Sequence, residues 1–338
     1  MQQPHQPDNN KRSVLKTILS TIQKFKILQI LIPVIVISLI YMQGRKEIHR
    51  IHWRATFHHL HEMRPGVIAG LLGFALFSVA SLSLYDIILR RHFRMPISLW
   101  QTFRYSWIAN TCNSVIGFAG IAGVGLRTWL YRSQGVPVRV VTAIVAFLSM
   151  TTVIGLSVLA WLGVAGIFPI HPEIMSYAWI SYAVWGMALF LPLYLIIVRS
   201  GLYAKWVNRD SGLMNGWTIT FSVAASALEW MLAGLCFWLI AVQLLPGLSP
   251  YYTIGIYIAA AITGLLSMTP GGMGGFDLTV LIALQATGYP PDRTAAVLVL
   301  FRLFYYLIPC LMGLVLALIE LVMGNRRKRK RRGGIVSS

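Results

Sequence analysis

At residues 269–277 the sequence reads Thr-Pro-Gly-Gly-Met-Gly-Gly-Phe-Asp, in the middle of an otherwise apolar segment over 251–288. Proline and clustered glycines disfavour a continuous helix, so we expect the segment to break here. Irregular backbone at membrane depth needs protein or water around it, because lipid cannot satisfy its hydrogen-bonding groups. We therefore predict a functional re-entrant turn formed by Pro270, Gly271, Gly272, Gly274 and Gly275.

The composition places this turn in a membrane protein. Of 338 residues, 57% are hydrophobic and only 12% are charged, and 29 Lys and Arg against 10 Asp and Glu give a net charge of +19. A soluble domain has about 25% charged residues, and a disordered chain is far more polar. A soluble nucleic-acid binder can be this basic but not this apolar. We therefore predict an all-α polytopic integral membrane protein.

Six apolar segments predict full membrane spans, because most are longer than the roughly 20 residues needed to cross a bilayer. They are 27–42, 66–89, 138–166, 174–198, 217–245 and 295–323. The first is expected to be an uncleaved span rather than a signal peptide, because no cleavage site follows it.

A second broken segment covers 99–126 and contains Arg104, Asn110, Asn113 and four glycines. Its glycines, taken alone, are slightly better explained by close helix packing. Read with the break at 269–277, the segment predicts a second hairpin that enters and leaves on one side of the membrane.

The basic loops predict the orientation. The 167–173 and 246–250 loops contain no Lys or Arg, whereas the 90–98 and 199–215 loops contain three each. By the positive-inside rule we expect the basic loops and both termini in the cytoplasm of a bacterial cell. The stretch 45–64, an expected interfacial amphipathic helix with many arginines and histidines, then falls outside. A full-span interpretation of either broken segment therefore stays open.

This topology contains a symmetry. Residues 66–166 and 217–323 each read as span, broken hairpin and span, in opposite orientations. Inverted repeats with Gly/Pro-interrupted segments at matching positions are typical of transporter substrate sites. The domain organisation is then a basic N-terminus over 1–26, a transmembrane domain over 27–323 and a polybasic tail over 324–338.

Three of the ten acids lie in or beside apolar segments: Asp86, Glu229 and Asp277. A charge near the bilayer centre costs at least about 2.5–3.5 kcal/mol, so such residues usually face a cavity or a partner. For Glu229 we favour a functional role over a packing role. Asp86 is equally well explained as an interfacial partner of Arg90, and Asp277 suits a helix N-cap.

Two arginines complement these acids. Arg127 closes the first hairpin, and Arg302 lies eighth in the last span. Snorkelling is the alternative for Arg302, whereas a guanidinium fork suits a phosphate. A lipid headgroup with phosphate and amine needs both signs of charge, so we predict a phospholipid substrate.

The sequence contains no catalytic, metal-binding or nucleotide-binding signature, and we expect no cofactor. The histidines over 49–61 fit an interfacial polar face better than a metal site, and the three cysteines lie far apart. The basic run over 326–332 is expected to bind anionic membrane lipid rather than nucleic acid.

Several phrases together resemble the transmembrane region of the bacterial lysylphosphatidylglycerol synthase/flippase family, the multiple peptide resistance factors. They are Ser83-Leu84-Tyr85-Asp86, Trp107-Ile108-Ala109-Asn110-Thr111, Ile116-Gly117-Phe118, Gly125-Leu126-Arg127-Thr128, Leu228-Glu229-Trp230, the stretch 270–277, and Arg302-Leu303-Phe304-Tyr305-Tyr306. The resemblance covers roughly 25–325.

The resemblance implies a flippase that moves lysylphosphatidylglycerol to the outer leaflet, where its charge repels cationic antimicrobial peptides. It also implies that the family's membrane-embedded charges fall here on Asp86, Arg127, Glu229 and Asp277. Lysyl transfer belongs in the family to a soluble C-terminal domain, which these 338 residues do not contain. Three hypotheses follow: a flippase, a lysyltransferase alone or with a separate synthase, and a non-transporting scaffold. An oligomer is compatible with each.

Overall fold

The computed structural model describes residues 63–116, 121–199 and 216–333, and every regular element in these ranges is helical. The expected first span over 27–42, the N-terminus over 1–26 and almost all of the stretch 45–64 lie outside the described residues. Within them, five helical stretches are long and apolar enough to cross a membrane: Pro65–His92, Val138–Val164, Ala178–Ile197, Gly216–Leu244 and Pro291–Met323. The prediction of an all-α polytopic membrane protein is confirmed, and five of the six expected spans are present.

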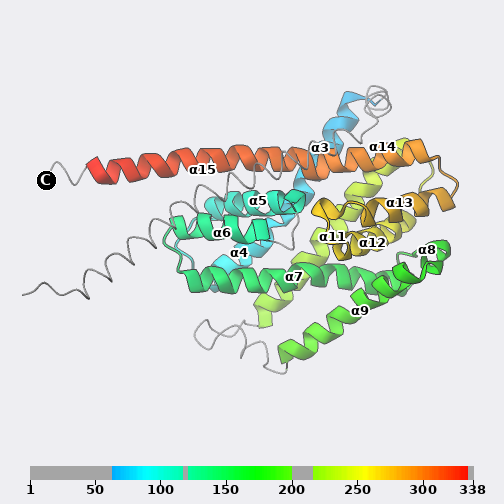
Figure 1. Cartoon of the computed structure of the whole chain (residues 1–338), viewed down its shortest axis with the longest axis horizontal. Helices are drawn as coiled ribbons and strands as arrows, with labels where there is room; N and C mark the ends of the chain where they lie inside the picture. The colour runs from blue at the N-terminus through cyan, green and yellow to red at the C-terminus, as the bar shows by residue number, and fades with distance from the viewer. Residues whose placement is uncertain (1–62, 117–120, 200–215, 334–338) are drawn as a thin grey trace, which may run out of the picture.

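The first repeat runs from α3 to α7 (Figure 1). A long broken helix leads to one end of the molecule, a helical hairpin enters from that end, and a continuous helix returns to the other end. These elements are α3 (Pro65–Ser81), α4 (Ser83–His92), α5 (Leu99–Ile116), α6 (Ile121–Ser133) and α7 (Val138–Val164). The short α8 (Pro172–Ser176) and the spanning α9 (Ala178–Arg199) follow.

The second repeat has the same order in the opposite direction (Figure 1). Its hairpin enters from the end that carries α8. The elements are α11 (Gly216–Leu244), α12 (Pro250–Leu266), the 3₁₀ turn η2 (Pro270–Gly272), α13 (Gly275–Ala286), α14 (Pro291–Phe301), the π-helical turn η3 (Arg302–Leu307) and α15 (Ile308–Gly333).

The second hairpin breaks at the predicted glycines. Gly271, Gly272 and Gly274 have φ angles of 62°, 68° and 90°, which favour glycine over residues with a side chain. The turn at Gly271 lies against Ser114, near the inner end of α5, so the second hairpin meets the first helix of the other hairpin inside the molecule.

Two interruptions of the long helices were not predicted. The first span breaks at Leu82, whose carbonyl oxygen accepts a hydrogen bond from the Asn110 side chain. A side chain inserted into the helical hydrogen-bond ladder is a recognised cause of such breaks. The last span contains η3, and π-helical turns are frequent at functional sites. Apolar sequence alone carries no signal for either feature.

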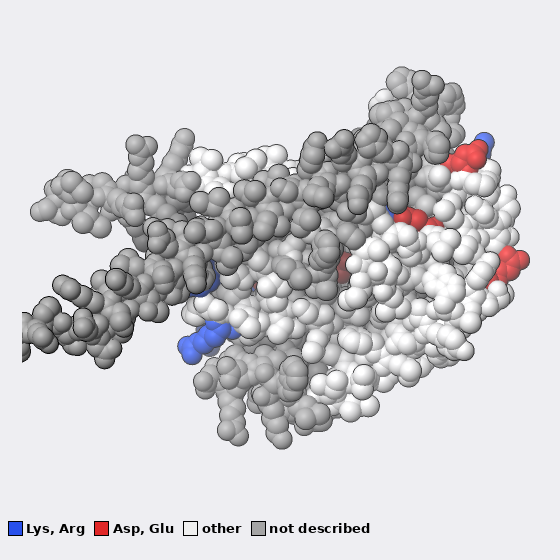
Figure 2. Space-filling view, viewed as in Figure 1, with Lys and Arg blue, Asp and Glu red and all other residues white. Residues whose placement is uncertain are grey.

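Charged residues divide between the two ends. In Figure 2, acidic side chains of the visible face lie mainly on the half that contains α8 and α14, and the larger basic patches lie on the opposite half, with a smaller one beside the acidic residues. The described loops at this second end and the helix ends beside them contain only basic charges, from Arg90, Arg91, Arg94, Arg132 and Arg139. The predicted asymmetry of the loops is therefore also an asymmetry in space.

Candidate functional site

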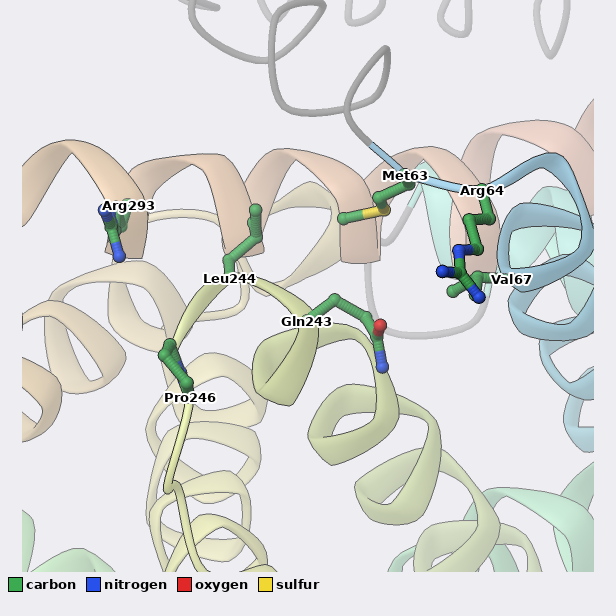
Figure 3. A pocket seen from close by; sticks show the side chains of 7 residues that line it. All are labelled: Met63, Arg64, Val67, Gln243, Leu244, Pro246 and Arg293. Carbon is green, nitrogen blue, oxygen red and sulfur yellow. The ribbon is translucent and has the colours of Figure 1, made fainter.

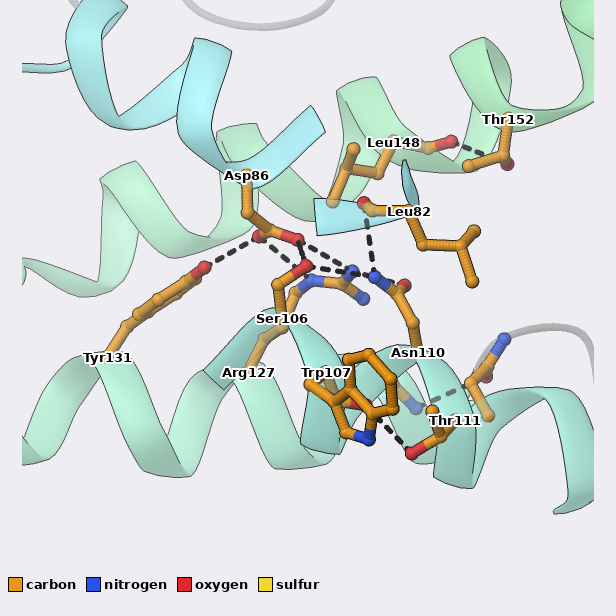
Figure 4. Close-up of polar contacts among 12 residues, drawn as sticks. Leu82, Asp86, Ser106, Trp107, Asn110, Thr111, Arg127, Tyr131, Leu148 and Thr152 are labelled. Carbon is orange, nitrogen blue, oxygen red and sulfur yellow. Dashed lines mark hydrogen bonds and ion pairs between the residues drawn. The ribbon is translucent and has the colours of Figure 1, made fainter. Parts of the chain in front are cut away.

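Asp86 is the centre of the most extensive buried polar cluster among the described residues (Figure 4). Arg127 donates two hydrogen bonds to it, from Nε to Oδ1 at 3.2 Å and from Nη2 to Oδ2 at 3.0 Å. The Tyr131 hydroxyl donates to Oδ1 and the Ser106 hydroxyl donates to Oδ2, both at 2.6 Å. Both carboxylate oxygens are thus saturated, although Asp86 has no exposed surface.

Asn110 ties this cluster to the helix break. Its side-chain oxygen accepts from Arg127 Nη2 at 2.6 Å, and its amide nitrogen donates to the Leu82 carbonyl at 3.3 Å. The first hairpin, which supplies Asn110 and Arg127, is therefore held against the first span by one connected network.

This arrangement differs from the expected pairing. Arg90 does not hold Asp86, because its Nε donates to the backbone carbonyl of Ile97 instead. Arg127, the residue expected to bind phosphate, is itself the partner of Asp86.

A second ion pair connects the other hairpin to the last span. Arg302 Nη2 lies 2.7 Å from Asp277 Oδ1 and 2.8 Å from Oδ2, and Nη1 lies 3.4 Å from the Gly271 carbonyl. Both side chains keep part of their surface exposed, 18% for Arg302 and 26% for Asp277. Arg302 therefore has a fixed protein partner, rather than only the snorkelling geometry considered as the alternative.

The expectation that Asp277 is an N-cap is wrong in detail. The N-cap of α13 is Gly274, and Asp277 is the third residue of the helix. Its Oδ2 accepts from the Gly274 amide at 3.1 Å, as the third residue of a capping box does. The positive φ of Gly274 requires glycine at the cap, which moves the capping carboxylate three residues along.

Glu229 lies apart from both ion pairs, in the middle of α11. Only 6% of the residue is exposed, and Oε2 accepts from the Tyr85 hydroxyl at 2.9 Å. Tyr85 precedes Asp86 in the chain, so these two neighbours connect α4 to α11 and to α6. Close by in the sequence, the buried hydroxyls of Ser83 on α4 and Ser222 on α11 have no hydrogen-bond partner among the described residues.

The sequence analysis missed a third ion pair, which is partly buried. Arg104 on α5 contacts Glu320 on α15 at 2.6 Å, and Tyr105 lies 3.5 Å from the same carboxylate. Glu320 lies near the end of the predicted span 295–323, where charged residues are common. The only signal that could have selected it is its match with Arg104, another charge placed in an apolar hairpin.

Each of the two hairpins contributes one charge to an ion pair with a full span, and the sign of that charge differs between the hairpins. The first hairpin supplies Arg127 to an aspartate of a full span, and the second supplies Asp277 to an arginine of a full span.

Comparison with known proteins identifies the family of this chain. The family model described as the lysylphosphatidylglycerol synthase TM region matches residues 26–313. The chain belongs to the lysylphosphatidylglycerol synthase transmembrane family. The resemblance drawn from the sequence phrases is thereby confirmed, and the chain is a multi-pass membrane protein of this family.

Similar members of the lysylphosphatidylglycerol synthase family carry one name. The phosphatidylglycerol lysyltransferase of Bacillus subtilis (strain 168) is 31% identical over 304 residues, which cover 89% of this chain and 35% of that protein. That of Staphylococcus haemolyticus (strain JCSC1435) is 29% identical over 313 residues, which cover 93% of this chain and 36% of that protein. That of Staphylococcus aureus (strain MRSA252) is 32% identical over 243 residues, which cover 72% of this chain and 28% of that protein. The chain thus spans about a third of the length of these relatives.

Proposed function

We propose that this chain is a lipid flippase of the bacterial cytoplasmic membrane. It moves aminoacylated phosphatidylglycerol to the outer leaflet, where the added positive charge contributes to resistance to cationic antimicrobial peptides. The observation that carries the proposal is the pair of interior ion pairs, one on each hairpin. The membrane family of the chain supports the lipid class.

The chemistry of the headgroup matches the charges available. A lysylated phosphatidylglycerol carries one phosphodiester and two amines, so it is a cation of net charge +1 when both amines are protonated. The predicted site contributes three carboxylates and two guanidiniums, which leave one net negative charge when all are ionised. The guanidiniums of Arg127, and less directly Arg302, would bind the phosphate, and the carboxylates of Asp86, Glu229 and Asp277 would bind the amines.

The ion pairs suit an exchange of partners. In the described structure Arg127 pairs with Asp86 and Arg302 pairs with Asp277. A headgroup can offer its phosphate to the arginine and its ammonium to the aspartate. The arginine–aspartate pair would then be replaced by an arginine–phosphate pair and an aspartate–ammonium pair, and no buried charge would be left unpaired. The unpartnered hydroxyls of Ser83 and Ser222 would supply further hydrogen bonds.

An outer-leaflet labelling assay tests the proposal. Cells that make the aminoacyl lipid are treated with an amine reagent that does not cross the membrane, and labelled lipid is divided by total lipid. We expect the labelled share to fall at least fivefold in a deletion strain and in Glu229→Gln. Glu173→Gln, an exposed acid on α8, is the matched control and should behave as the parent chain. Unchanged labelling in the deletion strain would overturn the proposal.

The names of the relatives favour a second candidate, phosphatidylglycerol lysyltransferase activity. Purified protein incubated with labelled lysyl-tRNA and phosphatidylglycerol tests it, with and without a separate synthase. Labelled lipid from the chain alone would support transfer by the chain itself. Labelled lipid that depends on the added synthase, with no change in outer-leaflet labelling, would indicate a scaffold instead.

A further inference from the structure

Two arginines line one open cavity at the end of the molecule opposite to the basic loops. The cavity has a volume of about 420 Å³ and is lined by Met63, Arg64, Val67, Gln243, Leu244, Pro246 and Arg293. Figure 3 shows Gln243 and Leu244 between Arg64 and Arg293. None of the seven lining residues is acidic, so the cavity contains two positive charges without a counter-charge in its lining.

The position of these arginines calls for an explanation. Arg64 is the last charge of the stretch 45–64, which disagrees with the positive-inside rule in the expected orientation. Arg293 lies at the same end, in the first turn of α14. Both are exposed, and the neighbouring Asp292 does not line the cavity. Two arginines that line one cavity on this side are better explained by a bound ligand than by the rule that sets membrane orientation.

The lining is chemically mixed in a way that selects the ligand. Guanidinium groups bind phosphate oxygens through paired N–H donors. The Gln243 amide nitrogen can donate to an ester oxygen, and its amide oxygen can accept from a glycerol hydroxyl. Met63, Val67 and Leu244 offer apolar surface beside these groups, which suits the start of an acyl chain and not a free phosphate ion. The N-termini of α3 and α14, beside which the arginines lie, have no side-chain caps and add weak positive potential.

We infer that this cavity is a binding site for the phosphodiester of an anionic phospholipid, with Arg64 as the phosphate ligand beside Val67, Gln243 as a headgroup contact, and Arg293 at the far end of the cavity as a second positive charge. Its placement at the outer leaflet rests on the proposed orientation of the flippase. The binding of the phospholipid does not depend on that orientation, so it is tested without a transport assay.

Photo-crosslinking of the purified full chain provides the test. A photoreactive residue replaces Val67, and nanodiscs contain traceable phosphatidylglycerol or traceable diacylglycerol with the same acyl chains. We expect phosphatidylglycerol to crosslink at least fivefold more than diacylglycerol, and the excess to disappear in Arg64→Gln/Arg293→Gln. Arg139→Gln, an exposed arginine at the other end, should keep it. Arg64→Lys/Arg293→Lys, which retains the charge, should keep part of it.

Two results would overturn the inference. Equal crosslinking of both lipids in the parent chain would show that the cavity only contacts acyl chains. Competition by inorganic phosphate at the same concentration as phosphatidylglycerol would show a site for free phosphate. Because crosslinking does not require flipping, a failure of the flippase proposal would leave the expected crosslinks in place.

Discussion

At the scale of single residues, the decisive feature is that each predicted membrane charge has a fixed partner from another helix. Asp86 is held by Arg127, Asp277 by Arg302, and Glu229 by the Tyr85 hydroxyl. Taking two charges out of water is costly and is repaid only with good geometry and additional hydrogen bonds. Asp86 meets this condition fully, since four hydrogen bonds reach its two oxygens.

Removing one member of the Asp86–Arg127 pair should lower the stability of the protein more than removing both. Asp86→Asn leaves Arg127 buried without an anion, and losing one partner of a buried pair typically costs about 3–5 kcal/mol. We expect a clear fall in Tm in detergent for the single variant. Asp86→Asn/Arg127→Gln should recover part of the loss, because no lone charge remains. A double variant with the summed losses of the two single variants would contradict this coupling.

Tyr85→Phe tests the support of Glu229. It removes the donor to Glu229 Oε2 without changing the volume of the ring much. Leaving a buried acceptor unsatisfied costs about 1–3 kcal/mol, so Tm should fall. Tyr251→Phe, on an exposed tyrosine, is the control and should leave Tm unchanged. An equal Tm for both variants would mean that Glu229 is satisfied in another way.

At the scale of elements, the contact between α7 and α11 depends on one glycine. The Gly155 amide donates to the Ser226 hydroxyl at 2.9 Å, and Ser226 in turn donates to the Thr152 carbonyl at 3.1 Å. Small residues allow such close backbone approach between membrane helices. Because α11 also carries Glu229, this contact fixes the position of that carboxylate relative to the first repeat.

Gly155→Ala should therefore separate the two helices. A Cβ atom at this position would overlap the Ser226 carbonyl, which is backbone and cannot rotate away. We expect a destabilisation of about 1–3 kcal/mol or more, measured as a lower Tm in detergent. Gly186→Ala on α9 is the matched control, since nothing lies within 4 Å of its Cβ position. Equal Tm values for the two variants would rule out tight packing at Gly155.

The helix breaks show how far sequence can predict elements. The break at 269–277 could be predicted, because proline and glycine change local backbone preferences wherever they occur. The interruption at Leu82 could not, because the side chain that contacts its carbonyl oxygen is Asn110, 28 residues away in another helix. The same holds for the π-helical turn at Arg302, whose side chain pairs with a different element.

At the scale of the whole molecule, the two ends differ in charge and face different sides of the membrane in the proposed orientation. One end contains the basic loops near Arg139, and the other contains Asp292 at the start of α14. The re-entrant hairpins enter from opposite ends (Figure 1). The two repeats therefore meet in the interior, where the flippase proposal places the lipid headgroup.

Cysteine labelling checks this orientation. The three native cysteines are free and buried, so they should react little with a membrane-impermeant maleimide. In intact cells we expect Asp292→Cys to be labelled and Arg139→Cys to be protected, and both to react after permeabilisation. The reverse pattern would place the basic loops outside and contradict the orientation.

The sequence by itself determined the membrane class, five described spans, the glycine break and which charged residues are unusual. Each of these depends on how a local segment interacts with lipid or on its own backbone preferences, so local composition is sufficient. Only the tertiary structure decided the partners. Arg127 and Asp86 are 41 residues apart, Arg302 and Asp277 are 25 apart, and Glu229 and Tyr85 are 144 apart. An ion pair depends on distance and orientation in space, and these are set by the packing of helices from both repeats.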